Sequence, residues 1–326
     1  MPHRTYLSRL RRRLPLLVTA GIFAALFITA GCLYDGFFSW RVGVNLLTDN
    51  AGLGFVAVGM TLVIFAGGID LSVGAVAGFT CILVATLIEK HHVHPGLAVL
   101  IALALGAAFG AAMGALIHVF RQPPFLITLA GMFLARGGAF WLNTESVGIT
   151  HPLYDRISSW AWELGPLNLP VVTLAVIGIL LLGGLLAHAT RFGRNLLALG
   201  GSEQSALLMG LPIGPTKIAV YAFGSFCAAG AGLVSTLYTG SGNPSTGIGL
   251  ELDAIAVVVI GGTLLTGGRG HMLGTLFGLL IFATIQAGLL FDGRLSPWWS
   301  RIVVGVLLLA FILLQRGLVR AATRKR

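Results

Sequence analysis

The chain has 326 residues, of which 56% are hydrophobic and only 10% are charged, and its mean hydropathy is +0.92. A soluble protein carries roughly 25% charged residues, so this chain has too little polar surface to coat a soluble globule. The net charge of +10 does not indicate nucleic-acid binding, because the basic residues lie at the two ends and in short polar gaps and do not form one contiguous face. The composition therefore predicts an integral membrane protein.

Ten apolar segments approach the length of about 20 residues that a helix needs to cross a bilayer core. They are 14–34, 51–67, 71–89, 96–120, 124–142, 168–190, 216–240, 250–266, 272–291 and 297–316. None shows the alternating pattern of a membrane β-barrel. We therefore expect an all-α polytopic bundle of about ten transmembrane helices, formed as a single domain over residues 1–326.

Lys and Arg are distributed unequally between the two sides of this bundle. With the N-terminus inside, 15 of the 21 basic residues fall on the cytoplasmic side and 5 outside, as the positive-inside rule requires. All six tryptophans lie at the outer edge, where an amphipathic ring suits the membrane interface. Both termini are expected in the cytoplasm, with basic segments at 1–13 and 317–326 and the largest cytoplasmic loop at 191–217.

Two glycine-rich segments interrupt the predicted spans in a similar way. Residues 67–74 (GGIDLSVG) separate the second and third spans, and residues 261–268 (GGTLLTGG) separate the eighth and ninth. At an offset of 194 residues, Gly67, Gly68, Leu71 and Gly74 match Gly261, Gly262, Leu265 and Gly268, and Ser72 matches Thr266. Matching breaks in two halves of a chain are typical of transporters with internal repeats. A purely structural turn is the alternative interpretation.

Asp70 and Arg136 are the charged residues nearest the membrane interior. A charge at that depth is costly, so it faces protein or water. Asp70 either caps the following helix, which we expect to begin at Leu71, or belongs to a solute pathway. For Arg136 we favour a structural role, binding backbone carbonyls or pairing with an acid. Two isolated charges make a poor proton relay, which argues against an ion-driven carrier.

Glu251 and Asp253 follow the glycine-containing loop 240–249 and are expected at the outer mouth of the span 250–266. They either hydrogen-bond a polar solute or cap the helix. The candidate pathway residues are therefore Asp70, Ser72, Glu251, Asp253 and Thr266.

The loop 191–217 contains a short predicted helix. Ser202 is a good N-cap, and Glu203 is well placed against the helix dipole. Residues 202–209 suffice for two turns, which Gly210 and Pro212 then end. Residues 207–209 (LLM) leave apolar surface on this helix, which either docks a partner or lies at the lipid interface.

The sequence supports no catalytic site. None of its three lysines lies in a phosphate-binding G-x-x-x-x-G-K-[ST] loop, and no credible Ser/His/Asp set is present. His91, His92 and His94 lack a second ligand cluster at metal-binding spacing, so a hydrated outer loop is the preferred interpretation. We expect no catalytic residue, no metal and no cofactor in this chain.

Three ordered motifs resemble the ribose-type sugar permeases of bacterial ATP-binding-cassette (ABC) importers. They are 59–74 (GMT through GGIDLSVG), 198–211 (ALGG through MGL) and 251–270 (ELDAIA through GGRG). The similarity covers nearly the whole chain. Segments 45–50, 151–155 and 291–293 resemble most the permeases of the galactofuranose importer.

The resemblance implies a permease of the bacterial inner (plasma) membrane that pairs with a second copy or a paralogue. ATP would be bound and hydrolysed by separate cytoplasmic ATPase subunits, and a periplasmic sugar-binding protein would deliver a monosaccharide. Membrane lipid surrounds such a subunit, and nucleic acid is not a partner. The segment that docks onto the ATPase would contain Gly200, Gly201, Ser202, Glu203, Ala206, Met209 and Gly210. Many relatives have Asn where this chain has Ser202, so its contacts to the ATPase are expected to differ.

Three alternatives remain open at this point. A permease of the same superfamily for branched-chain amino acids would need partners for ammonium and carboxylate groups. An ion-coupled secondary carrier would need no ATPase. A purely structural or assembly subunit would leave the two glycine-rich breaks without a use.

Overall fold

The computed structural model describes residues 2–165, 167–294 and 298–323. Residues 324–326 of the predicted cytoplasmic tail, Met1 and Pro297 of the last predicted span lie outside the described residues. The described first half contains α1 (Pro2–Leu33), α2 (Trp40–Thr48), α3 (Ala51–Phe65), α4 (Val73–Glu89), α5 (Pro95–Val119), α6 (Pro124–Leu142), β1 (Val147–Gly148), α7 (Pro152–Ser159), β2 (Ala161–Leu164) and β3 (Leu167–Pro170). The second contains α8 (Val171–Ala189), α9 (Arg191–Gly201), α10 (Glu203–Leu208), α11 (Ile213–Thr239), β4 (Ser241–Gly242), α12 (Leu250–Ile260), α13 (Met272–Asp292) and α14 (Trp298–Thr323).

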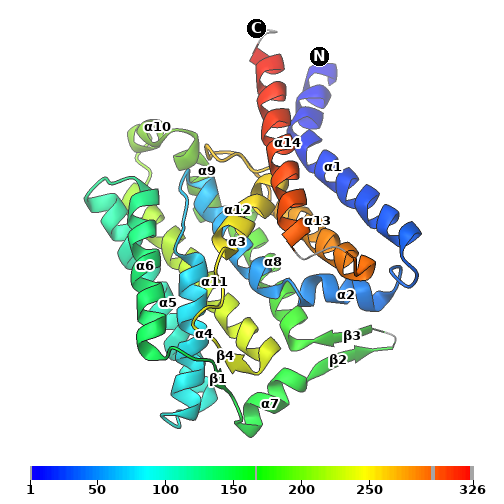
Figure 1. The fold of residues 1–326 in the computed structure, drawn as a ribbon. Helices are drawn as coiled ribbons and strands as arrows, with labels where there is room; N and C mark the ends of the chain where they lie inside the picture. The colour runs from blue at the N-terminus through cyan, green and yellow to red at the C-terminus, as the bar shows by residue number, and fades with distance from the viewer. Residues whose placement is uncertain (1, 166, 295–297, 324–326) are drawn as a thin grey trace.

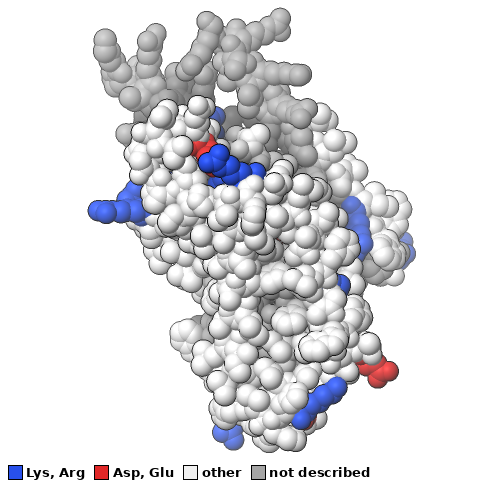
Figure 2. Space-filling model, turned by 90° about the vertical axis from the view of Figure 1, so that its left-hand side faces the viewer, with Lys and Arg blue, Asp and Glu red and all other residues white. Residues whose placement is uncertain are grey.

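The helices form a bundle whose two ends differ (Figure 1). The N-terminus, the C-terminus and the short helix α10 lie at one end, while α7 and the β2–β3 hairpin lie at the other. This arrangement agrees with the prediction that both termini share a side with the loop 191–217. On the face shown in Figure 2, most of the surface between the two ends is uncharged, as a lipid-facing belt requires.

Six helices in the described part of the chain are long and apolar enough to cross a membrane: α5, α6, α8, α11, α13 and residues 16–33 of α1. The pair α2 and α3, bent by 58° at its break, raises this number to seven if it forms one span. The spans predicted at 71–89 and 250–266 correspond to α4 and α12, which have 17 and 11 residues. The count of about ten transmembrane helices is therefore not confirmed and stays a prediction.

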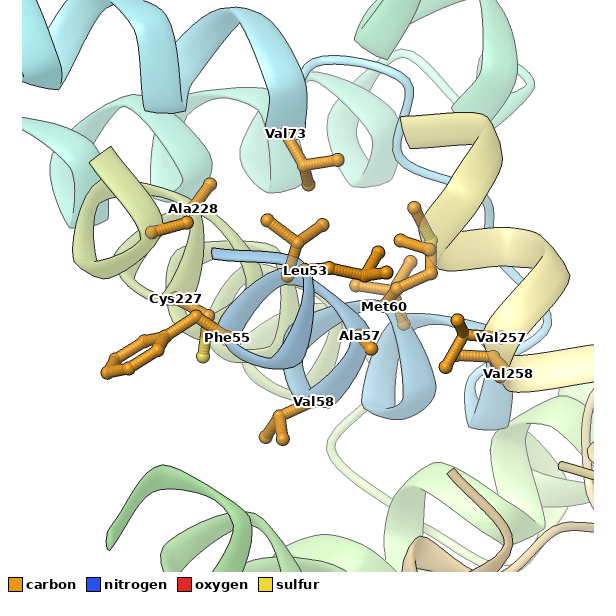
Figure 3. Packing of buried hydrophobic residues seen from close by; sticks show 14 of the residues in the cluster. Leu53, Phe55, Ala57, Val58, Met60, Val73, Cys227, Ala228, Val257 and Val258 are labelled. Atoms are coloured by element: carbon orange, nitrogen blue, oxygen red, sulfur yellow. The ribbon is translucent and has the colours of Figure 1, made fainter. Parts of the chain in front are cut away.

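Helix α3 forms the centre of the bundle. Every residue in it except Gly52 is buried, because a helix that is apolar on all sides is stable only when other helices surround it. It packs against α8, α9, α11, α12 and α13. Figure 3 shows Leu53 and Met60 of α3 among side chains of the same buried cluster, including Val73, Ala228 and Val257.

Helices α5 and α11 make the most extensive contact, along a row of glycines. The two G-x-x-x-G steps at Gly106, Gly110 and Gly114 face α11 at Ser225, Tyr221 and Ile218. A side chain at Gly110 would collide with the carbonyl of Tyr221, so the absence of side chains allows the two backbones to touch. These glycines thus serve helix packing.

Two small antiparallel sheets lie outside the helical core. Strands β2 and β3 form a hairpin in which Ala161 faces Pro170 and Leu164 faces Leu167. Strands β1 and β4 pair Val147 with Gly242. This second pairing fixes the beginning of the 241–249 segment, which connects α11 to α12.

Candidate functional site

Three glycine-rich segments that are far apart in the sequence meet at one point of the fold. They are the first break (residues 66–72, between α3 and α4), the second break (residues 261–271, between α12 and α13) and the end of α9. The amide of Gly268 in the second break donates a hydrogen bond of 3.1 Å to the carbonyl of Phe65, the last residue of α3. We call this meeting point the glycine junction.

The glycine junction is packed backbone against backbone. A Cβ on Gly200 of α9 would collide with the carbonyl of Phe65 and would lie 2.6 Å from the amide nitrogen of Gly268. Gly267, at φ +82°, comes so close that a Cβ there would lie 2.7 Å from the Cα of Gly67. The two breaks, which match in sequence, are therefore also in contact in space. The end of α9 packs against both of them.

A single residue, Ser202, separates the end of α9 at the glycine junction from the beginning of helix α10. Ser202 caps it, accepting a hydrogen bond of 3.2 Å from the amide of Ser205, and Glu203 forms an ion pair of 2.7 Å with Lys217 at the start of α11. Ala206 is buried, and Gly210 ends the segment at φ +74°. The predicted cap, length and end of this helix are confirmed.

The far side of α10 carries an apolar tip that nothing in the described chain covers. Leu207, Leu208 and Met209 are 63%, 83% and 66% exposed. Since the other side of α10 is held by Ala206 and Glu203, the tip cannot turn inward without breaking these contacts. Its role in docking a partner stays a prediction, as does the role of the other coupling residues.

Asp70 lies in the first break and is fully buried. Its Oδ1 atom accepts hydrogen bonds from the amide of Ser72 (2.9 Å) and from the Ser72 hydroxyl (2.6 Å). Asp70 therefore fixes the conformation of the residue that precedes α4, but it is not the N-cap that we expected, because Ser72 occupies that position and the helix begins at Val73 and not at Leu71. The second oxygen of Asp70, Oδ2, has no hydrogen-bond partner among the described residues.

Tyr221 of α11 brings a second unsatisfied polar atom to the first break. Its hydroxyl is buried, makes no hydrogen bond within the described chain, and lies so close to Gly68 that a Cβ there would collide with it. The sequence did not identify this residue as a candidate, because a tyrosine within an apolar span gives no signal of its own. A donor and an acceptor thus remain unpaired beside the glycine junction.

Arg136 of α6 holds the 241–249 segment in place. Its Nη1 atom donates hydrogen bonds to the carbonyls of Pro244 (2.6 Å) and Thr246 (2.9 Å). Glu251 lies within electrostatic range of the same guanidinium. The predicted structural role of Arg136 is confirmed for the backbone carbonyls, whereas no ion pair with an acid is found among the described residues.

The 241–249 segment runs along α4 into the bundle. Gly242 packs against Ala85, and Gly247 packs against Gly74, eleven residues nearer the start of α4, which is a distance of ~16 Å along the helix. The carboxylate of Glu251 lies directly against Gly74. The prediction that Glu251 and Asp253 lie at the outer mouth of a full span is therefore wrong, because the segment before α12 re-enters the bundle and α12 is a short helix.

The candidate pathway residues do not form one cluster. Asp70, Ser72 and Glu251 lie near the start of α4, whereas Asp253 lies within electrostatic range of Arg301 on α14. Thr266 is exposed in the second break, with its carbonyl beside Gly67. Contact of any of the five with a solute stays a prediction.

The end of α9 and helix α10 thus combine close backbone contacts at the glycine junction with an exposed apolar tip. Among the described residues, no group of three or more His, Cys, Asp or Glu side chains could hold a metal ion. The model of the family described as "Branched-chain amino acid transport system / permease component" matches residues 43–312. The chain belongs to this family of transport permeases.

Individual relatives have names that specify their transport system. The chain is 48% identical to the inner membrane ABC transporter permease protein YjfF of Escherichia coli, over 95% of this chain and 94% of that protein. It is 36% identical to the fructose import permease protein FruG of Bifidobacterium longum, over 97% and 94%. It is 37% identical to the ribose import permease protein RbsC of Bacillus subtilis, over 84% of each. No solved structure matches the chain.

Proposed function

We propose that this chain is the permease subunit of a bacterial ABC importer and forms the inner-membrane pathway for a monosaccharide, galactofuranose or a similar sugar. The exposed tip of α10, fixed to the glycine junction, is the observation that carries the proposal. A cluster of exposed apolar side chains marks a surface that a protein or a membrane covers. The relatives named as sugar permeases support the choice of cargo.

The subunit works with partners that supply energy and cargo. The α10 tip docks onto one of two cytoplasmic ATPase subunits. A second permease copy or a paralogue completes the pathway, and a periplasmic binding protein delivers the sugar. The chain crosses the inner membrane about ten times, with both termini in the cytoplasm. ATP is bound by the partner, and this chain itself holds no cofactor.

The mechanism follows from how α10 is connected. Closure of the ATPases shifts α10, and α9 transmits the shift through Gly200 to the end of α3 and to the second break at once. Since the junction contains backbone contacts without intervening side chains, little of the displacement is absorbed by rotamer changes. The nucleotide drives transport only if the ATPases bind one arrangement of the bundle better than the other.

Reconstitution tests this proposal. The full chain is placed in proteoliposomes with the ATPase and binding protein encoded in neighbouring reading frames, and uptake of radiolabelled galactofuranose, ribose, fructose and leucine is measured. We expect ATP-dependent uptake of a sugar, with galactofuranose preferred. Uptake of leucine alone would favour the amino-acid alternative. Uptake that persists without ATP and collapses with the proton gradient would favour a secondary carrier.

A further inference from the structure

A groove between α8 and α13 lies outside the proposed coupling device. It has a volume of about 430 Å³, and its walls are formed by Leu180, Leu181, Leu185 and Leu276. The groove runs along more than two turns of α8, which is ~12 Å. It is apolar along its length and ends at a pair of histidines, His188 and His271.

The two histidine rings are stacked, with centroids 4.1 Å apart and an interplanar angle of 21°. The amide of Met272 donates to Nε2 of His188 (3.1 Å), and the amide of Leu273 donates to Nδ1 of His271 (3.1 Å). In the neutral rings, the proton is therefore carried by Nδ1 of His188 and by Nε2 of His271. Both histidines are exposed and line the groove, and Nδ1–H of His188 is a donor at its end.

Basic residues flank the same end of the groove. Arg269 precedes His271 by two positions, and Arg191 follows His188 by three. Both arginines are exposed, and neither forms an ion pair within the described part of the chain. No acid lines the groove. This end of the groove is therefore electropositive and lies at the end of the bundle that carries α10 and the termini.

We propose that this groove is a binding site for an anionic phospholipid. One acyl chain lies between α8 and α13, and the headgroup phosphate is held by Arg269 and His188, with Arg191 beside it. A basic pocket between transmembrane helices on the cytoplasmic side is suited to such headgroups. The inference does not depend on which solute the chain transports.

The position of the site connects it to the glycine junction. Helix α8 continues into α9, which ends at Gly200, and α13 begins directly after the second break. A lipid between these two helices contacts both elements that lead to the junction.

Native mass spectrometry of the full chain in detergent micelles tests the site. The chain is titrated with phosphatidylglycerol and with phosphatidylethanolamine of the same acyl composition, and glycerol 3-phosphate is added as a soluble competitor. We expect tighter binding of phosphatidylglycerol and no competition by glycerol 3-phosphate below millimolar concentration. Equal binding of the two lipids, or full displacement by the soluble phosphate, would overturn the proposal.

Two pairs of variants locate the binding. Arg269→Gln is expected to weaken phosphatidylglycerol binding about fivefold, whereas Arg121→Gln, which removes an exposed arginine from the α5–α6 turn, leaves it unchanged. Gly184→Leu fills the groove, since a Cβ there meets only Met272 at 4.0 Å, and is expected to abolish binding of the lipid. Gly178→Leu on the same helix meets open space outside the groove and is the matched control.

The outcome of these variants decides the assignment. Thermal melting first shows that each variant is folded. Unchanged phosphatidylglycerol binding in folded Gly184→Leu, or equal losses in Gly184→Leu and Gly178→Leu, would overturn the site between α8 and α13. Unchanged binding in Arg269→Gln would overturn the role of the arginine in holding the phosphate.

Discussion

The amide of Gly268 donates a hydrogen bond of 3.1 Å to the carbonyl of Phe65, across 203 positions of the sequence. This bond joins the end of α3, the most buried helix of the bundle, to the second break. Gly200 lies against both of its atoms. A movement of α9 therefore reaches the centre of the bundle through main-chain atoms alone.

Leu208→Ser tests whether the apolar tip of α10 docks onto a partner. Leu208 is 83% exposed, so its replacement is expected to change the melting temperature little. We expect at least a tenfold loss of affinity for the ATPase subunits, measured by pull-down or interferometry, because a central apolar anchor is removed. Gln204→Ala, on the same helix but polar and exposed, is the control. Equal binding by wild type and Leu208→Ser would contradict docking through the tip.

Replacement of tyrosine by phenylalanine is expected to have opposite effects on stability at Tyr221 and at Tyr154. The Tyr221 hydroxyl is buried without a partner in the described chain, so Tyr221→Phe is expected to raise the free energy of unfolding by about 1 kcal/mol. The Tyr154 hydroxyl is hydrogen-bonded to Thr236, whose own hydroxyl donates to Leu233, so Tyr154 is the donor. Burial raises the pKa of Tyr154 to about 12, so the phenol keeps its proton at neutral pH.

Tyr154→Phe is accordingly expected to lower the free energy of unfolding by about 1 kcal/mol. Thermal or denaturant unfolding of both variants in the same detergent measures the difference. Destabilisation by both substitutions to the same extent would mean that the Tyr221 hydroxyl has a partner in the membrane-embedded protein.

Arg136→Met removes the donor to the carbonyls of Pro244 and Thr246 and the cation beside Glu251. Unpaired buried groups then remain, and we expect a loss of about 2–3 kcal/mol in the free energy of unfolding. Arg121→Met, which alters an exposed turn, is expected to change it by less than about 0.5 kcal/mol. Comparable melting temperatures for these two variants would contradict the structural role of Arg136.

The sequence was sufficient where local chemistry determines the structure. Ser202, Glu203 and Gly210 specify the start and end of α10 through capping, the helix dipole and a positive φ, all of which act within a few residues. The backbone-binding role of Arg136 also followed, since an intramembrane guanidinium needs oxygen partners.

Backbone contacts between residues far apart in the sequence could not be predicted from local sequence patterns. The depth of Glu251 depends on Gly247 fitting against Gly74, a contact over 173 positions, and hydropathy alone favours a full-length span there. The stack of His188 on His271 likewise depends on how α8 and α13 cross. The echo between the two breaks was visible as a repeat, but their contact at Gly67 and Gly267 required the fold.

The pair Gly200 and Gly201 tests the coupling route most directly. The two glycines are equivalent in the sequence motif. In the structure, however, a Cβ on Gly200 would collide with the carbonyl of Phe65, whereas a Cβ on Gly201 would meet nothing within 4 Å. We therefore expect the two alanine variants to behave differently, although they are neighbours in the same helix. Both are first checked for folding and for binding to the ATPase subunits, so that a transport defect is not mistaken for misfolding.

The measurement is the amount of sugar imported per ATP hydrolysed in proteoliposomes that contain the complete transporter. Gly200→Ala is predicted to lower this ratio at least tenfold while ATPase binding persists, and Gly201→Ala is predicted to retain it within about twofold. Equal ratios for the two variants would contradict the transmission of ATPase movement through the glycine junction.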